Sequence, residues 1–196
     1  MERKQYSCEW KGCSEKAPFH LTWAQFRRSV REQHLCEQHA RELVEHYWKT
    51  ARVGDGNPAI LHGSTCFDLE LVLITETDDK QVIYLREVGG TRSIPIVTGL
   101  FEAWSLVTKL QAHQSPRPLT HDAMLAAIQA MGGEMEDVLI DNLEGHIYYA
   151  KVRIRQGGRL VSVDTRPSDA FSLAVRAERP IFFANEVLAK LDAAQG

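Results

Sequence analysis

The polar stretch Asp164-Thr-Arg-Pro-Ser-Asp-Ala170 is the most informative part of the sequence, because it leads from a short apolar run into the start of a helix. A strand is predicted before it at 160–163, and its proline suits the first turn of a helix that reaches about residue 177. In a second polar stretch, Arg117-Pro-Leu-Thr-His-Asp122, the threonine is placed to cap a helix that ends near residue 131. Charged side chains are costly to bury without partners, so both stretches need an explanation.

Outward from these stretches, strands and helices come in groups rather than in strict alternation. Period-two and β-branched runs predict strands, and apolar residues at helical spacing predict helices. The predicted strands are 66–75, 81–86, 93–97, 138–140, 146–154, 160–163 and 180–184, and the predicted helices are 100–110, 120–131, 167–177 and 186–192. This grouping favours an α+β fold with a mixed β-sheet flanked by helices.

The distribution of cysteine, glycine and proline predicts two structural units. Three of the four cysteines lie in the N-terminal part of the chain, and the Gly-, Asn- and Pro-containing stretch 53–58 is typical of a linker. We therefore predict a small zinc-finger-like domain at 1–50, a linker at 51–61 and the main α+β domain at 62–192.

Charge and hydropathy exclude some classes of protein. The formal net charge of −3 is not that of a protein that binds nucleic acid through its overall charge. No apolar run is long enough for a membrane helix, and the N-terminus lacks the apolar core of a secretory signal. We expect a cytoplasmic location, where clustered cysteines more often bind metal than form disulfides.

Two pairs of potential metal ligands lie in the N-terminal unit, Cys8 with Cys13 and Cys36 with His39. A structural zinc ion takes four thiolate or imidazole ligands in a tetrahedron. The second pair stands at the start of a helix predicted at 37–48, where residues three apart face the same side. A ligand-bearing turn and a ligand-bearing helix start together resemble a treble-clef zinc finger with a structural Zn²⁺ ion.

Several alternatives stay open for this unit. The cysteines can instead be small core residues, and His34 or His20 can replace His39 as the fourth ligand. The nearby basic and aromatic side chains form either a nucleic-acid-binding surface or a solvated helix face with its aromatics packed on the finger: Arg27, Arg28, Arg31, Arg41, Trp10, Trp23 and Phe26.

The main domain, over residues 66–190, resembles the bifunctional nuclease family, which is named for activity on both DNA and RNA. The two polar stretches are the specific part of this resemblance. Shorter matching segments accompany them: Leu85-Arg-Glu87, Ile94-Pro-Ile96, Gly99, Glu102-Ala103, Leu173-Ala174, Arg176 and Pro180-Ile181. The resemblance implies a nuclease that acts on DNA, RNA or both, and it does not imply the zinc finger.

Phosphodiester hydrolysis requires an activated water and stabilisation of negative charge on the phosphate oxygens, and a carboxylate-bound divalent cation provides both. Asp164 and Asp169, with Asp122 brought near by folding, are the candidate ligands for Mg²⁺ or Mn²⁺. Histidine side chains titrate near neutral pH, so His121 is the candidate general acid or base.

Phosphate binding has its own candidates. Arg166 and Arg117 are suited to it because a guanidinium group binds two phosphate oxygens at once. Ser168 stands near a predicted helix start, where a hydroxyl and backbone N–H groups bind phosphate together. Glu102 is a weaker additional carboxylate.

The same residues have a purely structural interpretation. Asp164, Arg166 and Asp169 can form an ion-pair and capping network at a strand-to-helix corner. Thr120 can cap the next helix, with Asp122 interacting favourably with the helix dipole. The decisive observation is whether the three aspartates converge in an open cleft or pair with buried arginines.

The leading interpretation is a metal-dependent nuclease whose zinc finger binds nucleic acid or a partner protein. The alternative is a non-catalytic regulatory module that self-associates and binds a partner or a small anionic ligand, and hydrolysis of another phosphate or acyl compound is a third reading. A homo-oligomer, dimeric or larger, is predicted because 69–74 and 180–183 supply apolar strand-edge surface.

Overall fold

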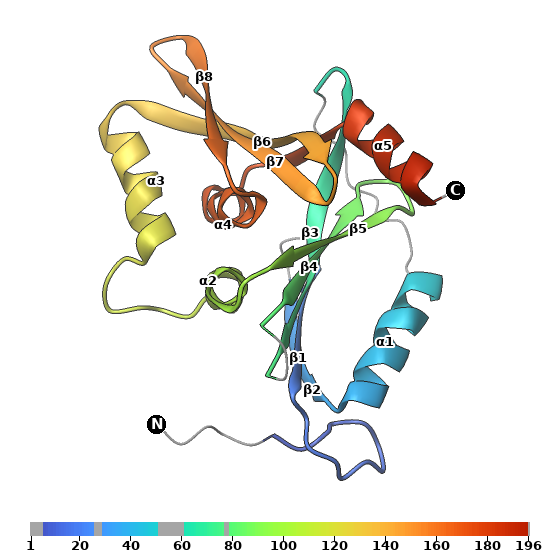
Figure 1. Cartoon of the computed structure of the whole chain (residues 1–196). Helices are drawn as coiled ribbons and strands as arrows, with labels where there is room; N and C mark the ends of the chain where they lie inside the picture. The colour runs from blue at the N-terminus through green and yellow to red at the C-terminus, as the bar shows by residue number, and fades with distance from the viewer. Residues whose placement is uncertain (1–5, 26–28, 51–60, 77–78, 196) are drawn as a thin grey trace.

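The computed structural model describes residues 6–25, 29–50, 61–76 and 79–195, so the predicted linker at 51–61 lies almost entirely outside the described residues. Within these ranges, nine strands form one sheet and five helices pack against it (Figure 1). The sheet contains parallel and antiparallel pairs. The fold is therefore α+β with a mixed sheet, as predicted.

The strands are β1 (Phe19–Gln25), β2 (Ser29–Leu35), β3 (Ser64–Thr75), β4 (Gln81–Glu87), β5 (Ser93–Thr98), β6 (Gly133–Glu144), β7 (Ile147–Gln156), β8 (Arg159–Thr165) and β9 (Ile181–Ala184). The helices are α1 (Glu37–Thr50), α2 (Leu100–Leu110), α3 (Thr120–Ala130), α4 (Pro167–Ala177) and α5 (Asn185–Gln195). Every strand and helix predicted after residue 62 is present. The hairpin β1–β2 was not predicted.

Strand β3 links the N-terminal hairpin to the rest of the sheet. One edge of β3 pairs first with β9 and then with β1, while the opposite edge pairs with β4. β9 lies parallel to β6, and β7 and β8 follow as antiparallel strands. A strand of 12 residues is long enough to accept two successive neighbours along one edge. The N-terminal hairpin therefore shares a sheet with the main domain.

Two hydrophobic cores lie against this sheet. The larger one is built from sheet residues such as Phe67 and Leu85 and from Phe171 of α4, all fully buried. Burial of one such side chain stabilises the fold by about 1.5–3 kcal/mol. Figure 1 shows α2, α3 and α4 together on one side of the sheet. The smaller core surrounds Leu21 and Leu35 of the hairpin, and it includes cysteines and one residue of β3.

The apolar stretches assigned to a self-association surface lie inside the protein. Leu71 and Val72 of β3 and Phe183 of β9 have no exposed surface, because both strands are central in the sheet. The prediction that 69–74 and 180–183 supply exposed strand edge was wrong for this reason. Self-association itself stays a prediction. None of the described helices has the length and apolar character that a membrane span requires.

The start of α3 differs from the prediction in one respect. Thr120 is the first helical residue rather than the cap, and Leu119 occupies the cap position without a side-chain cap. The carboxylate of Asp122 instead accepts a hydrogen bond from the backbone N–H of Leu119 at 3.0 Å. Asp122 therefore stabilises the helix start, where a negative charge also interacts favourably with the helix dipole.

Candidate metal centre and candidate active site

The four predicted zinc ligands come together in the N-terminal unit. The ligand atoms of Cys8, Cys13, Cys36 and His39 all lie within 4.8 Å of one another. His39 Nδ1 is 3.1 Å from the Cys36 sulfur and 3.4 Å from the Cys8 sulfur. Tetrahedral zinc, with bonds of about 2.3 Å to sulfur and 2.0 Å to nitrogen, places such atoms about 3.6 Å apart. The cluster can hold one metal ion.

Local structure positions these side chains. The N–H of Cys13 donates to the carbonyl of Trp10 at 3.0 Å, and Gly12 closes this turn with a φ of +87°, which a residue with a Cβ rarely adopts. Cys36 directly precedes α1, and His39 lies in the first turn of that helix. The indole ring of Trp10 stacks on the imidazole of His39 with centroids 4.9 Å apart. A turn and a helix start thus present two ligands each.

The thiols influence each other's ionisation. Burial raises the pKa of Cys8, but backbone and side-chain hydrogen bonds outweigh it and lower this pKa to about 7. The backbone of His39 favours the Cys36 thiolate, whereas burial and the neighbouring Cys8 sulfur raise the pKa of Cys36 to about 11. Two adjacent thiolates repel one another unless a cation lies between them.

The predicted basic and aromatic surface is only partly described. Trp23 is buried in the smaller core, and Trp10 packs on His39. Phe26, Arg27 and Arg28 lie outside the described residues. Trp23 therefore follows the structural alternative, in which the aromatic residues pack on the finger, whereas Trp10 stays partly exposed.

The β8–α4 corner holds a network of charged side chains. Arg166 precedes α4, and its Nε donates to Asp169 Oδ2 at 2.7 Å while its Nη1 lies 3.0 Å from Glu102 Oε1. Burial raises the pKa of Asp169, but hydrogen bonds from Arg166 and His121 outweigh it and hold this pKa below its ordinary value. The corner thus keeps an ionised carboxylate next to a guanidinium group.

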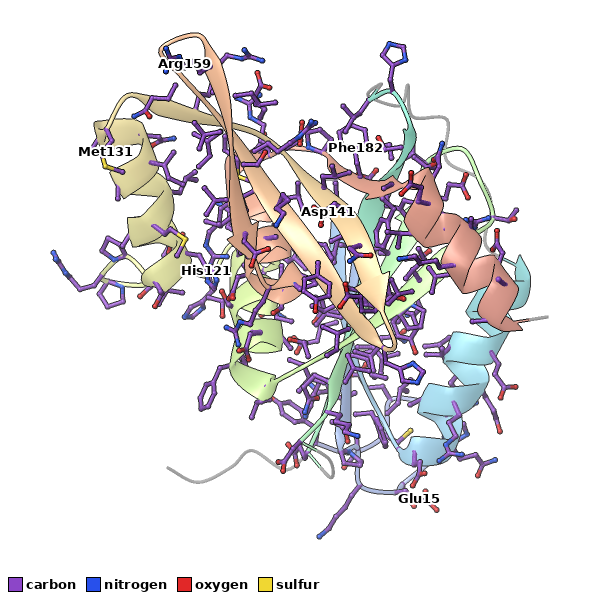
Figure 2. The ribbon with its side chains drawn as sticks, turned by 45° about the horizontal axis from the view of Figure 1, so that its top comes forward. Glu15, His121, Met131, Asp141, Arg159 and Phe182 are labelled. Carbon is purple, nitrogen blue, oxygen red and sulfur yellow. The ribbon has the colours of Figure 1, made fainter. Side chains whose placement is uncertain are left out.

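His121 links three helices. Its Nε2 is 3.1 Å from Asp169 Oδ1 on α4, and its Nδ1 is 3.0 Å from Ser105 Oγ on α2. Figure 2 shows His121 at the start of α3, on the side that faces these helices. A carboxylate only accepts hydrogen bonds, so Nε2 carries a proton, and the Nδ1 of a neutral ring accepts the Ser105 hydroxyl. Both ring nitrogens are therefore engaged within the protein.

Asp122 pairs with an arginine in the protein interior. The Arg176 side chain is 3% exposed, and its Nε donates to Asp122 Oδ1 at 2.7 Å. The same guanidinium donates to the carbonyls of Ser172 and Ser105. Burial raises the pKa of Asp122, but the N–H of Leu119 and the Arg176 guanidinium outweigh it and place this pKa below its ordinary value. Asp122 therefore connects α3 to α4.

Asp164 is the most accessible of the three aspartates. It lies opposite Lys151 in the β7–β8 ladder, and Lys151 Nζ donates to Asp164 Oδ1 at 2.6 Å. The Asp164 side chain is 72% exposed. The lysine bond leaves the rest of this carboxylate open to solvent, so Asp164 can bind a further ligand.

A pocket of about 710 Å³ opens at the β8–α4 corner. It contains three predicted site residues, Asp164, Arg166 and Ser168, together with the additional carboxylate Glu102. The remaining walls come from β5, the β6–β7 turn, the start of β7 and the end of α5, and include Val97, Thr98, Ile147, Tyr148, Tyr149 and Leu191. A separate, smaller pocket of about 340 Å³ contains Arg117, Asp122 and Arg176.

The three aspartates do not form one cluster. Asp122 and Asp164 lie in different pockets, and each of the three aspartates has a cationic partner of its own. Among the described residues, the groups of side chains with metal-binding geometry are the cysteine cluster and His20–Glu32–His34. Neither includes Asp122, Asp164 or Asp169.

Sequence reasoning missed Ser105 and Lys151. Ser105 follows Glu102 by three residues on α2, so the two polar side chains share a helix face, from which Ser105 contacts His121 of α3 and Glu102 contacts Arg166 before α4. Polar residues on the inner face of a predicted amphipathic helix were the available signal. Lys151 offered none, because its pairing with Asp164 depends on the register of β7 and β8.

Comparisons with known proteins concern the main domain. Residues 83–195 match the family model of the bifunctional nuclease domain. The chain is also similar to the uncharacterized proteins MT1877 and Rv1829 from two strains of Mycobacterium tuberculosis. Each is 34% identical over 119 residues, which cover 61% of this chain and 71% of the relative. The family match runs from β4 to α5 and includes the β8–α4 corner.

Proposed function

The chain belongs to the bifunctional nuclease domain family, and from this premise we propose that it hydrolyses phosphodiester bonds in DNA, RNA or both. The observation that supports this proposal most is the pocket of about 710 Å³ at the β8–α4 corner, which collects a guanidinium, a hydroxyl and two carboxylates. These are the groups that phosphate binding and hydrolysis require.

Phosphate binding is proposed for Arg166 and Ser168. The Arg166 side chain is 68% exposed, and its bond with Asp169 raises its pKa further, so it is a permanent cation at the pocket. Ser168 lines the same pocket within the first turn of α4, where the positive end of the helix dipole favours an anion. Arg117, in the separate smaller pocket, is proposed to bind a more distant phosphate of the same strand.

Asp164 and Glu102 are the proposed carboxylates for a divalent cation. Both line the pocket, and Mg²⁺ is commonly held by one or two carboxylates together with substrate phosphates and water. A bound Mg²⁺ or Mn²⁺ ion would stabilise negative charge on the phosphate and lower the pKa of a bound water. Asp164 is the more accessible ligand because most of its side chain faces solvent.

Asp169 and His121 are proposed to act through Arg166. Asp169 holds the Nε of Arg166, and His121 holds the other oxygen of Asp169. Since both nitrogens of His121 are already hydrogen-bonded, the geometry favours a positioning role over direct proton transfer to substrate. Asp122, paired with buried Arg176, is proposed to fix the α3–α4 contact on which this chain of bonds depends.

The test is cleavage of labelled single-stranded RNA and DNA by the full chain, with Mg²⁺, with Mn²⁺ and with no added divalent cation after desalting. Omission is preferred to EDTA because a chelator also removes metal from the cysteine cluster. The Arg166→Ala and Asp164→Asn variants are expected to lose activity by about 10²-fold or more. The matched control Asp79→Asn, at an exposed turn, is expected to keep full activity.

A variant counts only if its circular dichroism spectrum and unfolding midpoint match those of the wild type. Activity that survives in both Arg166→Ala and Asp164→Asn places the chemistry elsewhere or in a contaminant. A wild type with no activity under any of the metal conditions removes the nuclease proposal.

For the N-terminal unit we propose a treble-clef zinc finger that binds nucleic acid or a partner protein. The order of ligand turn, hairpin β1–β2 and ligand-bearing helix start supports this proposal, as does the convergence of three thiols and one imidazole. The ion would be structural because four protein ligands complete a tetrahedron. Zinc content measured on undialysed protein, with Cys66→Ser as the control outside the cluster, tests the proposal. Absence of zinc contradicts it.

The second candidate is a non-catalytic module that self-associates and binds a small anion. Its support is that each predicted catalytic aspartate already has a cationic partner, as in a structural network. Exposed Phe101 and Trp104, three residues apart on α2, offer an apolar surface for a second copy. An inactive wild type that forms dimers in light scattering favours this candidate.

A further inference from the structure

Two histidines and a glutamate form a second group with metal-binding geometry on the N-terminal hairpin. His20 and His34 are direct cross-strand partners in β1 and β2, and Glu32 precedes His34 by two residues on the same face. One ligand atom of each lies within 4.8 Å of the others. His34 Nε2 is 3.6 Å from Glu32 Oε1, a separation that one shared ion can bridge.

Each imidazole has one nitrogen oriented by another carboxylate. His34 Nδ1 is 2.9 Å from Glu9 Oε1, and His20 Nε2 is 3.1 Å from Glu76 Oε1. Metal-binding histidines commonly donate their second N–H to a carboxylate, which fixes the tautomer and turns the free nitrogen toward the ion. In this arrangement His34 Nε2 and His20 Nδ1 are the nitrogens that remain for a ligand.

The charges around this group favour a cation. The ion pairs that Glu9, Glu32 and Glu76 make with described residues are all directed at the two imidazoles. Three carboxylates thus surround the histidines without a lysine or arginine among their described partners. The imidazoles are largely buried, with side-chain exposures of 16% for His20 and 11% for His34. Burial strengthens the attraction between the nearby carboxylates and a cation.

We propose that His20, Glu32 and His34 bind a divalent first-row transition metal ion, with Zn²⁺ as the reference ion. Imidazole ligands favour Zn²⁺, Cu²⁺ or Ni²⁺ over Mg²⁺. Three protein ligands leave one coordination position for water or an outside ligand, unlike the closed cysteine cluster. Tyr6 stacks on His34 with ring centroids 3.8 Å apart and covers one side of the group. This site is independent of the proposed nuclease function.

The test is metal stoichiometry of the full chain after equilibrium dialysis at a fixed free Zn²⁺ concentration. Glu32→Gln and His20→Gln are each expected to bind one equivalent fewer than the wild type. Glu42→Gln, an exposed change on α1, is the matched control and binds as many equivalents as the wild type. Glu32 is partly exposed and its replacement is isosteric, so Glu32→Gln tests the site without removing a core side chain.

Titration with Co²⁺ distinguishes this site from the cysteine cluster. Ions bound by thiolates absorb through sulfur-to-metal charge transfer, whereas ions bound by imidazole and carboxylate do not. The number of equivalents without this absorption should be one lower in Glu32→Gln than in the wild type, whatever the cysteine cluster binds. If every bound equivalent shows the thiolate absorption, or if Glu32→Gln binds as many equivalents without it as the wild type, the histidines form only a hydrogen-bonded network and the proposal is overturned.

Discussion

The cysteine cluster and the β8–α4 corner both contain groups that bind cations. They differ in the partners that these groups already have within the protein. Around Cys8 and Cys36, hydrogen bonds to the sulfurs come from backbone groups and from His39. At the corner, Asp169 is bound by Arg166 and His121, and Asp164 by Lys151.

This difference separates two kinds of chemistry. Thiolates without a nearby guanidinium or ammonium group need a metal ion before they can share a buried space. Carboxylates paired with arginine and lysine have their charge offset already, so the exposed cations beside them can receive an anion such as phosphate. The first region offers four protein ligands for one metal ion, whereas the cation proposed for the second would need substrate phosphates and water as further ligands.

The largest expected effect comes from breaking the cysteine cluster. The Cys8→Ser/Cys36→Ser double variant should lose the bound zinc and destabilise the N-terminal unit by roughly 4 kcal/mol or more, because metal binding contributes directly to folding. Urea unfolding monitored by tryptophan fluorescence measures this loss, since Trp10 and Trp23 both lie in the unit. An unchanged unfolding curve with retained zinc contradicts the assignment of these ligands.

A smaller but clear effect is expected at the ion pair between buried Arg176 and partly exposed Asp122. Arg176→Met should destabilise the protein by about 2–4 kcal/mol, because it leaves Asp122 without its partner and two carbonyls without a donor. Arg166→Met is the matched comparison and should cost no more than about 1 kcal/mol, since that guanidinium is mostly exposed. If chemical denaturation shows that both variants lose the same free energy of unfolding, the two arginines do not differ in their contribution to stability.

The pH dependence of stability tests whether ionised Asp169 stabilises the β8–α4 corner. Its pKa in the folded state lies below the ordinary value, so its ionised form contributes stability above about pH 4, and this contribution is lost as pH falls through the folded-state pKa. Wild type should exceed Asp169→Asn in free energy of unfolding by about 1 kcal/mol at pH 7. The difference should shrink toward zero in acid. Denaturant midpoints measured across this range test it, and a constant difference would contradict it.

The smallest effect on stability is expected at the apolar surface of α2. Phe101 is 85% exposed, so Phe101→Ser should change the free energy of unfolding by less than about 0.5 kcal/mol. If this surface joins two copies, the variant should be monomeric while the wild type is dimeric in light scattering. A wild type that is monomeric at all concentrations contradicts the prediction of self-association.

Much of the main domain was predictable because its signals are local. Pro167 is the first residue of α4 and Pro95 lies in the edge strand β5, as their backbone restrictions require. The hairpin β1–β2 was not predicted, although Phe19, Leu21 and Trp23 alternate with polar residues in β1 as in a half-buried strand. β6 is longer than predicted. Its bulges interrupt the alternation of buried and exposed side chains, so the sequence pattern indicated only the middle of the strand.

Residue patterns were enough to predict the elements of the main domain, the polar strand-to-helix corner and the cysteine ligands, but they left His39, His34 and His20 as alternatives for the fourth ligand. The predicted features depend on residues within a few positions of each other, where backbone geometry limits the possible arrangements. The folded protein was needed to show which cation each aspartate pairs with, that His39 joins the cysteines and that His20 and His34 meet on the hairpin. Such contacts depend on strand register and helix packing between distant segments, and residue type and spacing predict neither of these.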